Sequence, residues 1–298
     1  MKIKTPFKTA FSLIEMSIVI LVIGLLIAGV TGSSRLVKKA KLTTARTLTE
    51  GAPVNSIDDL VMWFETTSNR SFLTPEVADG TIIDTWFDIR NSLGAKIAAV
   101  QEEDAAYNPI YTKGAINNLP ALKFTKAGGQ YLLFDGSVLV GTDYTLFVVD
   151  QRSVNGTGDD YMIGGDSVLA NKIIGLGYRT GGTIVYSGHG GTHDINYSLA
   201  ATNSSAKARI FTATLSVDDG KTLYINGRQV AVDTTQDQRL VQYIAGYIGR
   251  YGANIDYQYD GYIGEVIFFA RNLDTKERQA VENYLSKKWN VALNANYT

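Results

Sequence analysis

Oxygen-bearing side chains gather in one glycine-rich stretch of the sequence, where they could bind calcium. The set comprises Asn155, Asp159, Asp160 and Asp166, flanked by Gly156, Gly158, Gly164 and Gly165. Calcium binds carboxylate, amide and carbonyl oxygens, so the residue types fit such a site. The same residue types also make turns, and their spacing does not match the calcium loop of an EF-hand. A calcium site and plain turns therefore both stay open as hypotheses.

Both histidines of the chain, His189 and His193, lie in a second glycine-rich stretch, together with Asp194. Imidazole nitrogens and a carboxylate are zinc ligands, so a metal site is one hypothesis. The glycines favour a mobile turn, and no helical pattern aligns the two rings. The alternatives to zinc are a polar loop that contacts a ligand and a plain turn.

Tyrosines recur through the stretch GYIGRYGANIDYQYDGY, residues 246–262. Aromatic faces pack against sugar rings and dominate protein hot spots, while amides and carboxylates bind hydroxyl groups. Alternating tyrosines also form cross-strand pairs in sheets, which is the structural alternative. The middle of the stretch is typical of a loop between strands. We predict that its polar and aromatic side chains contact a ligand, namely Arg250, Tyr251, Asn254 and Asp256.

The chemistry of catalysis is poorly represented in the chain. Glycoside hydrolases need two carboxylates across the bond that they cleave, and no Glu-x-Asp-x-x-Glu-like spacing occurs. Glu265 is the one acid inside a strong strand pattern, which a sheet edge or a bulge would explain. The absence of cysteine excludes disulfides, thiolate metal sites and cysteine nucleophiles. A formal net charge of −1 gives no reason to expect nucleic acid as a partner. We therefore predict a binding protein and not an enzyme.

Glu15 is the single charged residue in an apolar run that extends from Phe11 to Ser34. The run is long enough to cross a bilayer, and the basic residues Lys2, Lys4 and Lys8 before it are typical of an export signal. A carboxylate deep in a membrane helix costs about 2.5–3.5 kcal/mol, however. Neither a plain membrane anchor nor a cleaved secretory signal accounts for this acid.

The elements that position these residues fall into two classes. No proline interrupts a helix from Phe11 to about Thr49, and the sequence Gly-Ala-Pro at 51–53 ends it. From Leu60 to about Arg271, short strand patterns alternate with turn signals, which predicts an all-β antiparallel sandwich. The sequence thus predicts a long N-terminal helix followed by a β-sandwich.

Individual segments support the sandwich. RIFTATLSV, residues 209–217, alternates apolar and polar residues, which predicts one core face and one solvent-facing side. Asn226-Gly227 suits a two-residue type I′ hairpin. YTLFVVD and GYIGEVIFFA are nearly continuous apolar runs that predict buried strands. Asp274 and Glu277 have capping-box spacing, and a helical apolar stripe follows, formed by Ala280, Val281, Tyr284, Leu285 and Trp289.

Residues 10–34 resemble the N-terminal segment of type IV pilins and the related pseudopilins. A short basic leader precedes Ala10, and Phe-Ser-Leu-Ile-Glu then opens the apolar run; the family usually has glycine at the position of Ala10. The resemblance implies that prepilin peptidase cuts between Ala10 and Phe11 and that Phe11 becomes the methylated first residue. Glu15 would then pair with such an α-amino group in a bundle of apolar helices, where the pair can specify register. The chain would reside in the inner membrane before the pilus machinery assembles it into an extracellular filament.

Residues 60–291 resemble concanavalin A-like, laminin G-like jelly-roll modules. The matching pieces are LVMWFE, LPALKF, GGQYLLFDG, YTLFVVDQRS, DGKTLYINGRQVA and DGYIGEVIFFARNLDTKERQAVENYLSKKW. Typical pilins carry instead a small sheet with a disulfide-closed loop, from which this chain departs. The two resemblances together imply a leader at 1–10, a pilin helix at 11–50, a linker at 51–59 and a lectin-like sandwich at 60–298.

The combined resemblance predicts a pilus subunit that polymerises with other pilin subunits and displays a module for adhesion to a glycan, a protein or another surface. One alternative is a structural pilin or secretion pseudopilin whose sandwich only coats the filament. A second is a tethered carbohydrate-active enzyme, which the missing carboxylate pair disfavours. Both a minor or tip position and a major subunit remain open.

Overall fold

The computed structural model describes residues 13–90, 97–101, 103–153, 158–167, 169–180, 183–187, 193–199, 206–252 and 257–294. Within the first helix, the side chains of residues 13–15 and 24–35 are left out of that description. Several predicted site residues therefore lie outside the described residues, namely Ala10, Phe11, Asn155, His189, Asn254 and Asp256. Glu15 is described only as part of a helical backbone.

The chain forms a long helix, two sheets and a second helix, in that order. The helices are α1 (Leu13–Glu50) and α2 (Thr275–Trp289), and short 3-10 turns lie at η1 (Pro53–Ser56), η2 (Ala105–Tyr107), η3 (Lys126–Gly128) and η4 (Ser137–Leu139). The first strands are β1 (Leu60–Glu65), β2 (Thr85–Phe87), β3 (Ala98–Val100), β4 (Ile110–Ile116), β5 (Leu119–Phe124), β6 (Leu132–Asp135), β7 (Tyr144–Arg152) and β8 (Asp160–Gly165). The others are β9 (Gly175–Arg179), β10 (Thr183–Ser187), β11 (Ile195–Ser198), β12 (Arg209–Ser216), β13 (Gly220–Ile225), β14 (Arg228–Asp233), β15 (Ala245–Ile248) and β16 (Gly261–Phe269).

The predicted long helix and antiparallel sandwich are both confirmed. The chain divides into two compact units, residues 1–43 and 44–298, so the last turns of α1 belong to the unit that holds the sheets. Among the side chains that the structure describes, which omit 24–35, no helix is both long and apolar enough to cross a membrane.

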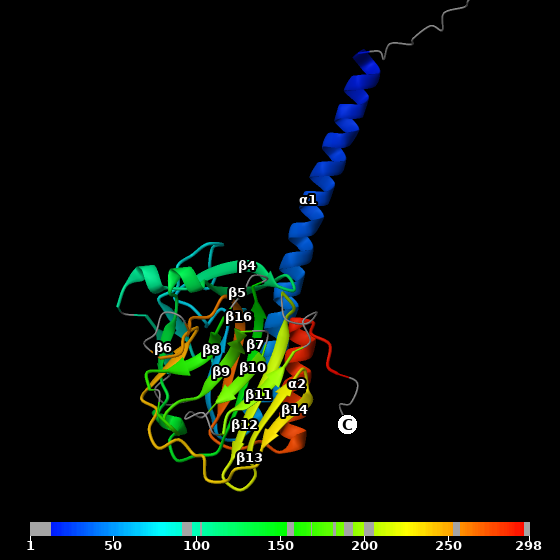
Figure 1. Ribbon diagram of the computed structural model, residues 1–298. Coiled ribbons are helices and arrows are strands. Elements are labelled where there is room, and N and C mark those ends of the chain that lie inside the picture. Colours follow the sequence, from blue (N-terminus) through cyan, green and yellow to red (C-terminus); the bar gives the residue numbers. More distant parts are fainter. Residues whose placement is uncertain are drawn as a thin grey trace, which may run out of the picture. The chain divides into compact units, whose positions relative to one another are not determined.

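The sandwich consists of two eight-stranded antiparallel sheets. Sheet A has the order β14-β13-β12-β7-β16-β5-β4, and β1 pairs with β16 beside β5; sheet B has the order β11-β10-β9-β8-β15-β6-β3-β2. One apolar cluster fills the space between the sheets, including Phe64, Phe134 and Phe268. A second cluster, with Trp63, Ile267 and Leu285, lies between the outer face of sheet A and α2. Figure 1 shows α2 beside the strands of sheet A.

Several local predictions are confirmed. Asp274 accepts from the Glu277 backbone N–H at 2.9 Å while Glu277 reaches back to the Asp274 N–H at 3.2 Å, which completes the capping box of α2. Asn226 and Gly227 have φ of 50° and 77°, as a type I′ turn requires, and join β13 to β14. The continuous apolar runs form β7 and β16, which are central strands of sheet A.

One prediction about β12 is wrong. Its threonines and serine were expected to face solvent, but Thr212 is fully buried, and Thr214 and Ser216 are nearly so. Thr212 donates a hydrogen bond of 2.8 Å to Glu282 on α2. Alternation of polar and apolar residues therefore separates the two faces of this strand correctly, while the polar face is covered by a helix and not by water.

The acid in β16 also has a different explanation from the expected sheet edge. Glu265 lies in a central strand, beside an irregularity in the pairing between Ile263 and Glu265, so only the bulge is confirmed. It stands directly opposite Glu65 of β1 in the antiparallel register. Two like charges at such a position repel each other. Lys288 of α2 lies between them, with Nζ at 2.7 Å from Glu65 and 2.9 Å from Glu265.

Further donors complete this buried network. Glu265 accepts hydrogen bonds of 2.7 Å from the indole nitrogens of Trp63 and Trp289 and from the Tyr284 hydroxyl. The Tyr284 hydroxyl also lies 3.2 Å from that of Thr49, in the last turn of α1. Burial alone would raise the pKa of Glu65, but the charge of Lys288 and hydrogen bonds from Lys288 and Thr67 hold that pKa below its usual value. The network thus joins β1, β16, α2 and the end of α1.

Candidate ligand-binding sites

Arg250 lies just after β15, where its guanidinium packs on tyrosine rings. The guanidinium carbon is 4.4 Å from the ring centre of Tyr131 and 5.1 Å from that of Tyr247. Its Nε donates to the Gly252 carbonyl at 2.7 Å, which fixes the orientation of the side chain. Tyr131 and Tyr247 contact each other edge to face, with ring centres 5.4 Å apart. Cation–π contacts of this kind contribute about 0.5–2 kcal/mol, depending on exposure.

This cluster extends to the surface. Tyr107 is 40% exposed and lies beside Tyr131, while Tyr247 and Arg250 are each partly exposed. We refer to Tyr107, Tyr131, Tyr247 and Arg250 as the tyrosine–arginine face. A guanidinium placed over aromatic rings presents both apolar ring surface and hydrogen-bond donors to a ligand. The prediction had singled out Arg250, whereas Tyr107 and Tyr131 come from a different part of the sequence.

Tyr251 has a different role from the one predicted for it. Its ring stacks on Tyr161 with centres 4.3 Å apart, and Tyr257 contacts both rings edge-on. Only 5% of Tyr251 is exposed. The residue therefore holds the segment after β15 against β8 and has little surface to offer a ligand, which corrects that part of the prediction.

The described members of the histidine stretch turn to separate partners. His193 Nδ1 lies 3.0 Å from the Thr235 hydroxyl, whereas Asp194 pairs with Arg179 at 3.5 Å. Lys221 donates to the backbone carbonyl of His193. Across the described parts of the chain, no three histidine or acidic side chains gather as they would around a metal ion.

The acidic residues proposed for calcium are spread along β8. Asp159 and Asp160 stand at its start and Asp166 follows its end, so the strand separates them by about 20 Å at ~3.3 Å per residue. Asp160 is fully buried and accepts from both Nε and Nη2 of Arg152, with Lys126 3.6 Å away. Asp159 accepts from the Thr180 N–H at 3.2 Å. Asp166 therefore lies too far along the strand to share one ion with Asp159 and Asp160, while Asn155 lies outside the described residues.

Another buried acid, Asp150, lies between the sheets and was not predicted from the sequence. Asp150 of β7 accepts hydrogen bonds through Oδ2 from Tyr178 at 2.8 Å and Tyr259 at 2.7 Å. Its Oδ1 has no hydrogen-bond partner among the described residues. Burial raises the pKa of Asp150 to about 6, against the lowering effects of the Arg209 charge and of the two tyrosine hydroxyls. The sequence did offer a signal for this site: Asp150 follows the apolar run of β7, and Arg209 opens β12.

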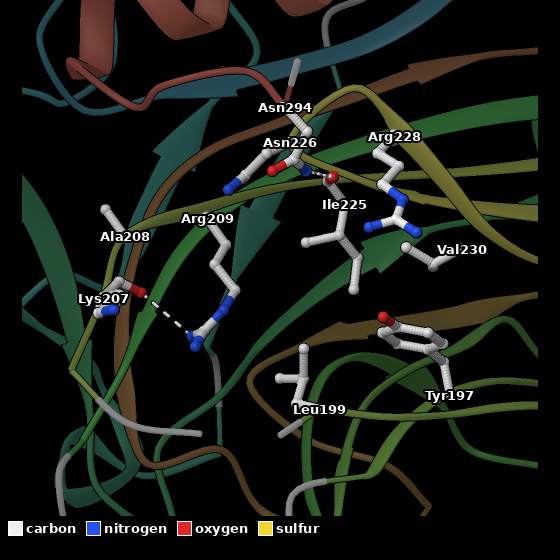
Figure 2. Close-up of a pocket in the computed structure, with 10 residues that line it drawn as sticks. All are labelled: Tyr197, Leu199, Lys207, Ala208, Arg209, Ile225, Asn226, Arg228, Val230 and Asn294. Carbon is white, nitrogen blue, oxygen red and sulfur yellow. Dashed lines mark hydrogen bonds between the residues drawn. The ribbon is translucent and has the colours of Figure 1, made fainter. Parts of the chain in front are cut away.

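Arg209, at the start of β12, links this interior to a pocket. The pocket has a volume of about 290 Å³ and opens where the edge strands β11 and β14 of the two sheets approach each other. Figure 2 shows Arg209 and Arg228 on either side of Ile225, with Tyr197 and Leu199 on the opposite wall. Arg209 is only 4% exposed, and its Nη1 donates to the Lys207 carbonyl at 3.2 Å and the Tyr178 hydroxyl at 3.5 Å.

No protein-family model matches the chain, and no curated protein matches it in sequence. Solved structures do match its fold. The binding domain of Paraclostridial Mosquitocidal Protein 1 superposes with a TM-score of 0.53 at 14% identity, over 78% of this chain and 53% of that one. A Trypanosoma rangeli sialidase in complex with the inhibitor DANA gives a TM-score of 0.50 at 14% identity, over 76% of this chain and 33% of the sialidase.

The chain thus spans about half of the toxin domain and about a third of the sialidase. At this level of identity the likeness concerns the fold. Together with the sheet order, it shows that residues 44–298 have the same kind of two-sheet antiparallel β-sandwich fold as these structures.

Proposed function

We propose that this chain is a subunit of a type IV filament whose sandwich contacts a glycan or protein surface. The observation that carries the proposal is the combination, on one chain, of a pilin-like Phe-Ser-Leu-Ile-Glu segment with a lectin-like sandwich. Cleavage after Ala10 would free the amine of Phe11, and Glu15 would pair with such an amine during assembly. In this proposal the chain enters the inner membrane first and then joins an extracellular filament.

The tyrosine–arginine face supports the contact role. Tyr107, Tyr247 and Arg250 are at least partly exposed over the buried ring of Tyr131, as a surface that recognises sugar rings or protein side chains requires. One of the similar structures is itself named a binding domain, which accords with such a role. We propose that the ligand packs across Tyr107, Tyr247 and Arg250.

Binding without catalysis is part of the proposal. Glu65 and Glu265 are adjacent acids, but both are buried beneath α2 and held by Lys288. A glycosidase needs its two carboxylates on an open cleft, where one of them can be protonated. Turnover of a polysaccharide by the purified sandwich would contradict this part of the proposal.

Assembly is tested by the mature N-terminus and by Glu15→Ala. We expect mass spectrometry to find a methylated phenylalanine at Phe11, whereas a start near residue 33 would indicate ordinary secretion. Glu15→Ala should be processed and inserted normally but should enter filaments poorly. Normal filament formation by this variant would refute the register argument.

Contact is tested with residues 44–298, which include the end of α1 that packs on the sandwich. We expect binding on a glycan or surface-protein array that Arg250→Ala abolishes. Arg250→Lys keeps the charge but loses the planar guanidinium, so it should also weaken binding. Lys276→Ala, an exposed change on α2, is the control. Failure to bind any surface would favour a sandwich that only coats the filament.

A further inference from the structure

The pocket between β11 and β14 carries positive charge without a balancing acid. Lys207, Arg209 and Arg228 line it, and none of the described lining residues is acidic. Arg209 is almost fully buried, yet its Nη2 has no hydrogen-bond partner among the described residues. A buried guanidinium nitrogen without an acceptor is costly, so an anion that reaches it would gain a strong charge-assisted hydrogen bond.

The buried acids behind the pocket do not form a close ion pair with Arg209. Asp160 is already paired with Arg152. Asp150 receives its hydrogen bonds from Tyr178 and Tyr259, and no described acid lies within ion-pair distance of Arg209. Asp150 lies opposite Arg209 in the register of β7 and β12 and interacts with its charge only at longer range. The Nη2 donor of Arg209 is therefore left for a ligand on the pocket side.

The remaining walls suit a sugar ring. Tyr197, Leu199 and Ile225 provide an aromatic ring and apolar side chains, on which the C–H face of a pyranose can pack. Two amides supply polar groups. Asn226 accepts from the Ile210 N–H through Oδ1, and Asn294 donates to the Ile225 carbonyl through Nδ2. The side-chain NH₂ of Asn226 and the side-chain Oδ1 of Asn294 are thus left to bind hydroxyl groups of a ligand.

We infer that this pocket binds a sugar residue that carries a carboxylate. The carboxylate lies between Arg209 and Arg228, and the ring packs against Tyr197. A volume of about 290 Å³ suits one monosaccharide unit, since pockets for larger organic ligands begin at ~300 Å³. The site differs from the tyrosine–arginine face, because it uses β11 at the edge of sheet B whereas Tyr247 lies on β15. It therefore goes beyond the proposed function and does not require filament assembly.

The test uses a matched pair of sugars that differ only at C6, D-glucuronate and D-glucose. The full chain, purified in a non-ionic detergent, is titrated with each sugar and binding is followed by saturation-transfer NMR and calorimetry. We expect glucuronate to bind and glucose to show no binding, with an affinity for glucuronate that falls as salt is raised.

Variants assign the binding to the pocket. Arg228 is exposed, so Arg228→Gln should fold normally and lower the affinity for glucuronate at least about tenfold. Arg209→Gln should abolish binding, with circular dichroism used to verify its fold. Lys276→Gln, an exposed charge removal on α2, should bind as the unchanged chain does. Equal binding of glucose, competition by inorganic phosphate at equal strength, or unchanged affinity in Arg228→Gln would each overturn the inference.

Discussion

Replacement of Lys288 by methionine should destabilise the sandwich strongly. Lys288 Nζ is fully buried and contacts both Glu65 and Glu265, which face each other across β1 and β16. Removal of one member of a buried ionic group costs about 3–5 kcal/mol, because the remaining charges stay buried without compensation. Domains unfold with total free energies of about 5–15 kcal/mol, so this loss would be a large fraction of the stability.

The assay is urea unfolding of residues 44–298 followed by tryptophan fluorescence. Trp63 and Trp289 donate to Glu265 and so report directly on the network. Lys287→Met is a matched control, because Lys287 is the neighbouring residue on α2 and is exposed. Its effect should stay within about 0.5 kcal/mol. Glu65→Gln combined with Lys288→Met should recover part of the loss, since it removes one of the two repelling carboxylates.

The same network predicts a dependence on pH. Because the folded-state pKa of Glu65 is lowered, its ionised form contributes stability above the ordinary value of 4.5, and that contribution disappears as the pH falls through the lowered value. Lys288→Met should remove this stabilisation, so the loss of unfolding free energy relative to the unchanged chain should be largest near neutral pH and should shrink as the pH falls and the two buried carboxyls are protonated. Equal unfolding free energies for Lys288→Met and Lys287→Met, with the same acid transition, would refute the reasoning.

Two further changes test the interior and the surface of the sandwich. Asp150 has a folded-state pKa raised to about 6, so its contribution to stability should fall by up to about 3 kcal/mol as the pH rises from ~4 to ~6, and Asp150→Asn should lose that slope in unfolding measured across this range. Gly164→Ala should weaken ligand binding at the tyrosine–arginine face and cost about 1–3 kcal/mol, because its Cβ would lie 2.2 Å from the Arg250 carbonyl oxygen and 2.6 Å from the Tyr251 Cα. Gly51→Ala, whose Cβ would meet the Thr47 carbonyl oxygen at an ordinary 3.5 Å, is the control, and equal binding and stability in the two variants would contradict the predicted clash.

Local sequence signals predicted the parts of the fold that depend on neighbouring residues. The capping box of Asp274 and Glu277 and the turn at Asn226-Gly227 need only short-range chemistry, and both are confirmed. The apolar stripe of α2 also identified its buried face, which includes Val281 and Leu285. Such features follow from backbone preferences that do not depend on the rest of the chain.

Contacts between residues that are distant in the sequence could not be predicted from these local signals. The alternation in β12 separated two faces, but the partner of Thr212 is Glu282, which lies on a helix that the strand pattern does not reveal. In the same way, Glu265 signalled an unusual position, while its partners Glu65 and Lys288 are distant in sequence. The pocket joins Tyr197, Arg209 and Arg228 from three strands, none of which carries a recognisable binding motif. Residue types could indicate chemistry here, but only the fold brings them together.

The arrangement of layers explains why ligand contact is assigned to sheet B and to the edge of the sandwich. The outer face of sheet A is occupied by α2, and Thr49 at the end of α1 bonds to Tyr284 of that helix. A ligand would have to displace the buried network around Lys288 to reach that face. The outer side of sheet B has no covering helix among the described residues, and it leaves Leu133 and Tyr247 at least partly exposed. Because α2 and the end of α1 at Thr49 occupy the outer face of sheet A, we assign the proposed recognition to the tyrosine–arginine face and to the pocket beside β11.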